Sequence, residues 1–166
     1  MNRLVNEFDV TAIELDNIHN AIKPMLNGGS LEEATKNIAA FCMESLLKNG
    51  ESIIVEGGWI EPLKAKEFVC SYGDRFVPVY CGYPKAIVEE HLKIVLAGKE
   101  HWLTKRDPET ARAFINEQIE GSEWYEEQCA TYGFKFFDFS NIAEGSDALH
   151  EHCREWLVGQ DGIVTV

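Results

Sequence analysis

The chain has 166 residues, of which 45% are hydrophobic and 26% are charged, and no Pro-, Gly- or Ser-rich tract interrupts it. This length and composition fit one globular domain with a substantial core and exclude collagen-like, fibrous and disordered classes. The formal net charge is -13, with 15 Lys and Arg against 28 Asp and Glu. A protein with this negative charge repels nucleic-acid backbones and anionic membranes, so we expect neither as a partner.

The cysteines and the apolar runs predict where the protein resides. Five cysteines are present, without C-x-x-C spacing, and the first residues carry no apolar signal run. This usage predicts a reducing, cytoplasmic location. The longest apolar runs are far below the ~20 residues of a membrane-spanning helix.

The N-terminal residues predict a helix end followed by a strand. Residues 1–8 have the pattern of a helix tail. Residues 9–16 then predict a turn and a buried strand that ends on the carboxylate of Asp16.

A short helical turn and then a helix are predicted next. Residues 17–22 form a short helical pattern, which Pro24 ends. Ser30, with Glu33 three residues later, predicts a capping box that begins an amphipathic helix over residues 30–50.

Residues 51–58 predict a strand whose end is functional. The run is β-branched and ends on Glu56, Gly57 and Gly58, as in a parallel strand buried on both faces. Open α/β sheets bind ligands at the carboxyl ends of their strands, so we expect a ligand-binding edge here.

The middle of the chain alternates helix and strand. A helix is predicted from Pro62 to Tyr72, and a strand over residues 75–82 with an irregular entry at Pro78. The next helix is predicted over residues 84–98, beginning at its proline.

One long helix and three shorter elements complete the pattern. Asp107 as N-cap and Pro108 begin a helix that ends at Gly133. The remaining elements are a strand, a helix and a strand-like run, over residues 134–140, 147–158 and 162–166. The order βαβαβααβαβ predicts one α/β domain over residues 1–166, with a doubly wound, mainly parallel sheet flanked by helices.

The run Ile53-Ile54-Val55-Glu56-Gly57-Gly58-Trp59-Ile60-Glu61-Pro62 resembles a segment of small P-loop kinases, particularly the 2-phosphoglycerate kinase-like and AAA-type group. Four further segments resemble this family in the same order, and they lie at Asp16, residues 76–84, residues 102–112 and residues 120–140, the last resembling the closing helix and strand of the family. The resemblance implies a phosphotransferase that uses ATP and Mg²⁺ on a small hydroxylated or phosphorylated metabolite, with a small lid at residues 98–112.

The phosphate-binding loop of that family is absent. No G-x-x-x-x-G-K-[ST] occurs, and the nearest approach, residues 97–100, lacks both the spacing and the hydroxyl for Mg²⁺. Positioning and charge neutralisation by this loop supply most of phosphoryl transfer, so we expect this chain to be impaired or inactive alone. The alternatives are a non-catalytic interaction protein that kept the fold, or an unrelated doubly wound enzyme whose ligand loop is Glu56-Gly57-Gly58.

The absent loop also removes a strand. The resemblance places that strand at the middle of the sheet, between residues 53–56 and 76–80. The backbone N–H and C=O groups of a buried strand need hydrogen-bond partners. We therefore expect either that residues 163–166 fill the position or that the two neighbouring strands pair directly.

Three residues are the predicted catalytic set: Asp16, Glu56 and Arg106. The resemblance implies that one carboxylate orients or deprotonates the acceptor hydroxyl, that the other touches Mg²⁺ through water, and that Arg106 offers a lid cation to the phosphoryl group. The alternative is that each carboxylate caps the helix turn that follows it and that Arg106 is solvated.

The predicted substrate-binding residues are His19, Gly57, Gly58, Trp59 and Lys105. A lone histidine is more often a surface residue, and packing is the preferred explanation of Trp59. We expect no metal site of protein ligands, because His150 and Cys153 share a helix face but His152 does not. A small-molecule partner and a homo-oligomer remain open.

Overall fold

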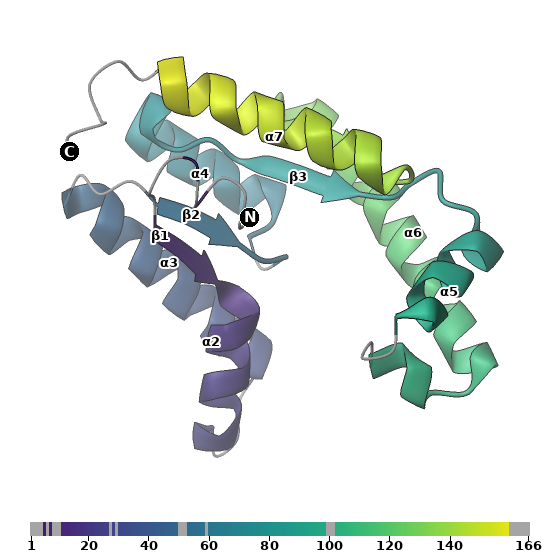
Figure 1. The fold of residues 1–166 in the computed structure, drawn as a ribbon. Coiled ribbons are helices and arrows are strands. Elements are labelled where there is room, and N and C mark those ends of the chain that lie inside the picture. Colours follow the sequence, from purple (N-terminus) through teal and green to yellow (C-terminus); the bar gives the residue numbers. More distant parts are fainter. Residues whose placement is uncertain are drawn as a thin grey trace. The chain divides into compact units, whose positions relative to one another are not determined.

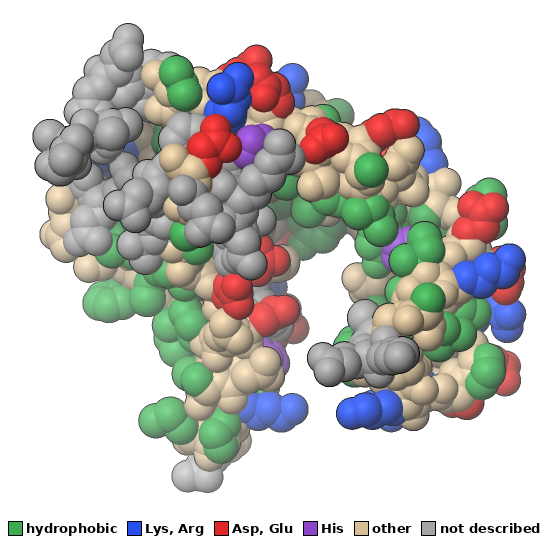
Figure 2. All heavy atoms as spheres, in the orientation of Figure 1, with side chains coloured by type: hydrophobic (Ala, Val, Ile, Leu, Met, Phe, Trp, Pro, Cys, Tyr) green, Lys and Arg blue, Asp and Glu red, His purple; other side chains and the backbone are tan. Residues whose placement is uncertain are grey.

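The computed structural model describes residues 5, 7, 11–26, 28, 30–49, 53–58, 60–98 and 102–159. The chain forms two compact units. Unit 1 comprises residues 1–77 and 150–166, and unit 2 comprises residues 78–149. Figure 1 shows the elements, and Figure 2 shows Asp and Glu side chains on the surface of both units.

Unit 1 contains the elements that surround the predicted edge. They are β1 (Thr11–Glu14), α2 (Leu15–Ile22), η1 (Lys23–Met25), α3 (Leu31–Asn49), β2 (Ile53–Glu56), α4 (Pro62–Tyr72) and η2 (Gly73–Arg75). The elements that follow are β3 (Val79–Gly82), α5 (Val88–Ala97), η3 (Trp102–Lys105), α6 (Pro108–Tyr132), β4 (Lys135–Asp138) and α7 (Ile142–Gly159). The last helix begins in unit 2 and ends in unit 1.

The sheet of unit 1 is one parallel pair. β1 pairs with β2 in a register that runs from Thr11 opposite Ile53 to Glu14 opposite Glu56. Parallel neighbours need a crossover connection, and α2 and α3 provide it. α3 buries one stripe of side chains at helical spacing, and its Met43 packs with Phe68 of α4 in the core of this unit.

Unit 2 repeats this arrangement with a second parallel pair. β3 pairs with β4, from Val79 opposite Lys135 to Gly82 opposite Asp138. α6 packs on both strands. Gly82 permits close approach of this helix, because a Cβ at this position would lie 2.6 Å from the Ser122 Oγ.

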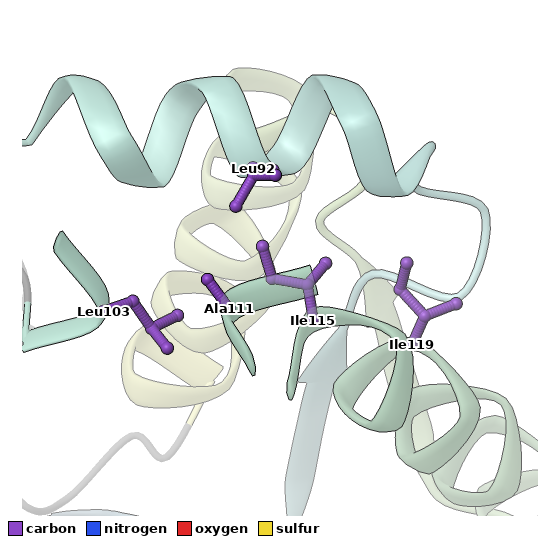
Figure 3. Close-up of a cluster of buried hydrophobic side chains, with 5 residues drawn as sticks. All are labelled: Leu92, Leu103, Ala111, Ile115 and Ile119. Carbon is purple, nitrogen blue, oxygen red and sulfur yellow. The ribbon is translucent and has the colours of Figure 1, made fainter. Parts of the chain in front are cut away.

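The core of unit 2 lies between α5, η3 and α6. Its buried side chains are Leu92, Leu103, Ala111, Ile115 and Ile119 (Figure 3). Ile115 and Leu103 are each 1% exposed. This cluster fixes the segment of the predicted lid against α6.

The predicted α/β class is confirmed in its coarse form. Helices and parallel strands alternate, and the described strands form two sheets of two strands each. Residues 53–56 belong to unit 1 and residues 79–82 to unit 2, so the predicted direct pairing of these strands stays a prediction. The tail at residues 163–166 lies outside the described residues, and its predicted pairing stays a prediction.

Several predicted helix ends are confirmed. The Asp107 side chain accepts a hydrogen bond from the Thr110 N–H at 2.9 Å, and Gly133 ends α6 with φ 74°. Ser30 Oγ accepts from the Glu33 N–H at 3.1 Å, which is the predicted cap of α3. Val5 and Glu7 are helical, as the pattern at residues 1–8 predicts.

Two helix starts were predicted wrongly. α5 begins at Val88 because Pro84 lies in a turn closed by a hydrogen bond of 3.1 Å from the Ala86 N–H to the Tyr83 carbonyl. Proline suits the second position of such a turn as well as the first position of a helix. α7 begins at Ile142, before the predicted residue 147. None of the helices that the structure describes is long and apolar enough to cross a membrane.

Candidate ligand-binding edge

The carboxyl edge of the β1–β2 pair brings the two predicted carboxylates to the same end of one sheet. Glu14 and Glu56 are directly opposite in the register. The prediction that the strand ends at Asp16 is wrong. The strand ends at Glu14, and Asp16 lies two residues later, in the first turn of α2. Because α2 follows β1 without a loop, Asp16 remains at the end of the sheet that carries Glu56.

The loop after β2 is open and glycine-rich. Gly57 has φ 146°, a conformation that side-chain-bearing residues rarely adopt. A Cβ at Gly58 would meet no heavy atom within 4 Å apart from those of its two chain neighbours. This backbone allows a ligand to approach the end of the strand closely. Trp59, predicted to stack on a ligand here, lies outside the described residues.

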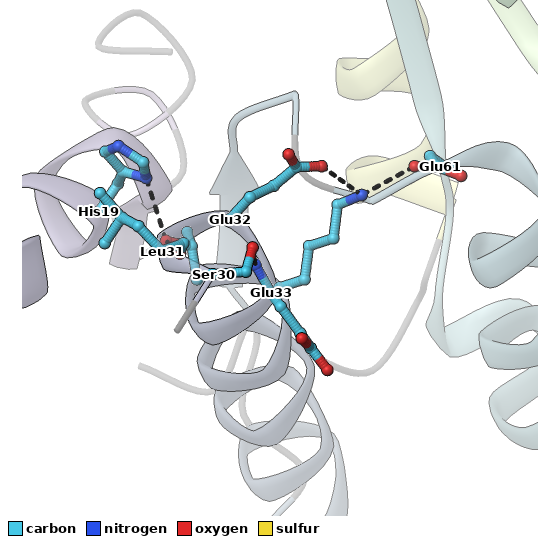
Figure 4. Close-up of polar contacts among 8 residues, drawn as sticks. His19, Ser30, Leu31, Glu32, Glu33 and Glu61 are labelled. Atoms are coloured by element: carbon cyan, nitrogen blue, oxygen red, sulfur yellow. Dashed lines mark hydrogen bonds and ion pairs between the residues drawn. The ribbon is translucent and has the colours of Figure 1, made fainter. Parts of the chain in front are cut away.

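The N-terminal part of α3 and the residue before α4 add charged side chains to this end of unit 1. Lys36 on α3 contacts Glu32 at 2.9 Å and Glu61, the residue before α4, at 2.8 Å (Figure 4). The hydrogen bonds that Lys36 donates to Glu61 and Glu32 raise the pKa of Lys36, and the bond that Glu32 accepts lowers the pKa of Glu32. The positive charge of Lys36 is therefore already shared between two carboxylates.

His19 joins α2 to α3 near this edge. Its Nδ1 lies 3.1 Å from the Oγ1 of Thr35, which is fully buried on α3. The Thr35 hydroxyl donates to the Leu31 carbonyl at 2.8 Å. Sequence reasoning identified His19 but not Thr35, because the pairing depends on the packing of two helices.

The edge as a whole is acidic. Its carboxylates are Glu14, Asp16, Glu32, Glu56 and Glu61. Asn17 Nδ2 donates to Glu14 at 2.7 Å, so a polar side chain also belongs to the edge. Carboxylates in this number accept hydrogen bonds from hydroxyl groups and repel anions. No group of three or more metal-ligating side chains occurs among the described residues.

The two predicted lid residues, Lys105 and Arg106, belong to unit 2. The Arg106 guanidinium lies over the ring of Trp102 at 5.8 Å, and the Arg106 N–H donates to the Leu103 carbonyl at 3.0 Å. Trp102 packs edge-on against Phe114 at 4.9 Å. These contacts give the segment a fixed local shape, and the approach of Lys105 and Arg106 to Asp16 stays a prediction.

Sequence reasoning missed a polar network at the carboxyl edge of the β3–β4 pair. Asp138 accepts from Lys85 Nζ at 2.9 Å and from the Ser140 N–H at 2.8 Å. Ser140 Oγ in turn accepts from the Lys85 N–H at 3.0 Å. The sequence did contain one signal for this network, because Asp138 is an acid at the end of a strand, as Glu56 is. Its partner Lys85, however, is 53 residues away in the chain.

This network makes a testable contribution to stability in acid. Partial burial raises the pKa of Asp138, but the hydrogen bonds from Ser140 and Lys85 outweigh it and hold the pKa below its usual range. Stabilisation from a lowered carboxyl pKa is present above the unfolded pKa of about 3.9 and is lost as pH falls through the folded value. We expect Asp138→Asn to reduce the acid dependence of the urea midpoint.

The control for that experiment is Asp74→Asn, because Asp74 is exposed on η2 and lies outside the network. The measurement is the urea unfolding midpoint between neutral pH and the acid limb. Equal acid dependence in wild type and Asp138→Asn would contradict the role assigned to Asp138.

Comparison of the chain with protein-family models, with curated proteins and with solved structures gave no match.

Proposed function

We propose that this chain is a kinase-like α/β domain that binds a small hydroxylated metabolite at the β1–β2 edge and does not transfer phosphate by itself. The observation that carries the proposal is the parallel register of Glu14 with Glu56, which puts Asp16, Glu56 and Gly57 at one end of one sheet. In this proposal Asp16 and Glu56 accept hydrogen bonds from the metabolite's hydroxyl groups, and Gly57 and Gly58 admit it to the backbone.

The strand pairing supports a doubly wound origin for this domain. The kinase resemblance puts a missing central strand between residues 53–56 and 76–80. The described ladders comprise β1 with β2 and β3 with β4, and neither contains a strand that falls at this position in the order. We propose that the two pairs are parts of one doubly wound sheet whose central strand is not among the four described.

ATP and Mg²⁺ do not fit the residues present. The sequence contains no Walker A motif. The described residues offer no cluster of metal ligands, and Lys36, the cation at the edge, is already engaged by Glu32 and Glu61. No step of a mechanism therefore passes through either group in this chain.

Calorimetry tests this part of the proposal. We expect Mg·ATP and Mg·GTP to bind no tighter than about millimolar, near −4 kcal/mol, because no lysine-bearing glycine loop cradles the phosphates. The measurement is titration of each nucleotide into the full chain. Micromolar binding that Glu56→Ala abolishes would overturn the assignment, because it would reveal a substitute cradle at this edge.

An interaction protein is the second candidate. Phe41 on α3 is 73% exposed and Leu63 on α4 is 60% exposed, so unit 1 presents large apolar side chains to solvent. This function predicts that sedimentation depends on protein concentration or on an added partner, and that small hydroxylated molecules do not bind. The metabolite-binding proposal predicts the opposite result for small molecules.

A further inference from the structure

One face of α6, the long helix of unit 2 (Figure 1), carries a tryptophan on the side that is turned away from the core. Trp124 comes two residues after Ser122, which on an α-helix is a rotation of about 200°. Trp124 is 44% exposed, whereas Ser122 is buried. The other side chains that α6 buries are Ala111, Ile115, Ile119 and Cys129. Because Trp124 lies opposite this buried stripe, packing in the core of unit 2 does not account for it.

The ring of Trp124 is nevertheless tied to the packed part of unit 2. It contacts the ring of Tyr125 in an edge-to-face arrangement, with ring centroids 4.9 Å apart. Tyr125 stacks in turn on Tyr80 of β3 at 5.7 Å. An aromatic side chain that is already positioned loses little rotamer freedom when a partner packs on it, and tryptophan is enriched among the residues that dominate protein interfaces.

Glutamates surround this tryptophan on the surface of α6. Glu120 comes four residues before Trp124 and Glu127 three residues after it, so both lie on its face of the helix. Glu117 lies about two turns before Trp124 on the same face, and Glu123 lies at the border of that face. All four glutamates are exposed. We call Trp124 and these four glutamates the α6 face.

The negative charge of the α6 face is not balanced in the part of the chain that the structure describes. Carboxylates on α3 and α7 form ion pairs with lysine or arginine three or four residues away. By contrast, no lysine or arginine occurs between Arg112 and Lys135, and the four glutamates of the α6 face form no ion pair with a described residue. Glu120 accepts a hydrogen bond from Asn116 Nδ2 at 2.6 Å, which leaves its charge in place. Like charges three or four residues apart on a helix repel one another, so a cation that approaches this face relieves the repulsion.

The two kinds of side chain on the α6 face favour the same partner chemistry. The face of a tryptophan ring attracts lysine and arginine cations, and carboxylates form charge-assisted hydrogen bonds with them. An acidic partner would be repelled by a protein of formal net charge -13. From Glu117 to Glu127 the face runs about 15 Å along the helix axis, a length that about five residues of extended chain would cover. Cations at alternate residues of such a chain lie on one side of it.

We propose that the α6 face docks a basic segment of a partner protein. In this interface the Trp124 ring packs against a lysine or arginine cation, and the carboxylates of Glu120 and Glu127 pair with the neighbouring cations of the segment. The interface lies in unit 2 and involves no residue of the β1–β2 edge. It therefore goes beyond the function proposed for that edge and does not depend on it.

Docking is tested by fluorescence anisotropy with the full chain and a labelled peptide in which arginine and alanine alternate. We expect the peptide to bind wild type, and to bind more weakly as salt screens the exposed charges. Trp124→Leu keeps an apolar side chain and removes the π system, so it should weaken binding about fivefold. Its melting temperature should stay that of wild type, because the position is on the solvent side of α6. Trp124→Phe, which keeps an aromatic ring, should bind with an affinity between the two.

A matched pair of double variants separates this face from general attraction to an acidic protein. One variant combines Glu120→Gln with Glu127→Gln, and the control combines Glu33→Gln with Glu155→Gln. Both change the net charge equally, and the two control residues are exposed and belong to unit 1. We expect a several-fold loss of peptide affinity in the first variant and little change in the control at physiological salt.

Four outcomes would overturn the proposal. The first is an equal loss in the two double variants, which would assign the binding to net charge alone. The second is wild-type affinity in Trp124→Leu, or no binding of the peptide to wild type at millimolar concentration. The third is binding of free spermine as tight as that of the peptide and equally dependent on Trp124, which would make the partner a small polycation. The fourth is self-association of wild type that Trp124→Leu abolishes in sedimentation, which would assign the face to a second copy of the chain.

Discussion

Gly145→Ala is expected to destabilise the protein by about 2 kcal/mol or more, because the site is already filled by backbone atoms. A Cβ at this position would lie 2.6 Å from the Asp138 carbonyl oxygen and 3.0 Å from the Phe139 Cα. Backbone atoms cannot rotate away as the end of a side chain can, so β4 or the start of α7 must shift. Urea unfolding followed by circular dichroism measures the loss.

The matched control is Gly121→Ala in α6. Gly121 is also a helical glycine, but its added Cβ would meet no atom within 4 Å. Alanine is the better helix former by roughly 1 kcal/mol, so Gly121→Ala should stabilise the protein. The two substitutions are therefore expected to have opposite signs. Stabilisation by both would show that the packing of α7 against the end of β4 is looser than the structure describes.

Ile115→Ala is expected to cost about 2–5 kcal/mol in the free energy of unfolding. Ile115 is 1% exposed and lies in the core between α5, η3 and α6 (Figure 3). Truncation removes three carbon atoms from this cluster and leaves a cavity that Leu92 and Leu103 would have to fill. The measurement is the urea midpoint at constant slope.

Ile94→Ala supplies the comparison for the core substitution. Ile94 is on α5, next to the same core, but its side chain is 56% exposed. The same chemical change there should cost less than about 0.5 kcal/mol, as is usual for surface positions. Equal losses at the two positions would contradict the assignment of Ile115 to the core.

The residues at the end of β2 were predictable from the sequence. Glu56-Gly57-Gly58 follows a β-branched run, and a strand that ends on an acid and glycines marks an edge where ligands bind. The exact position of Asp16 was not predictable, because the chain passes from β1 into α2 without a loop residue. The local sequence pattern cannot identify the last residue of a strand when the side chains at the junction suit a strand and a helix equally well.

The sequence by itself determined the local elements of this protein and most of their ends. α6 is the clearest case, because Asp107 satisfies an N–H of its first turn and Gly133 takes the left-handed conformation at its end. These are interactions over a few residues, so their signals are contained in short segments. The alternation of helix and strand, and hence the α/β character, followed from the same signals.

Only the tertiary structure decided which strands pair and which polar groups meet. The structure pairs β1 with β2 and β3 with β4, which the sequence did not reveal, since an apolar strand pattern does not specify its neighbour. Lys85 reaches Asp138 across 53 residues, and Thr35 contacts His19 across 16. Such contacts depend on how elements pack after they form, and the periodicity of a single chain carries no information about that packing.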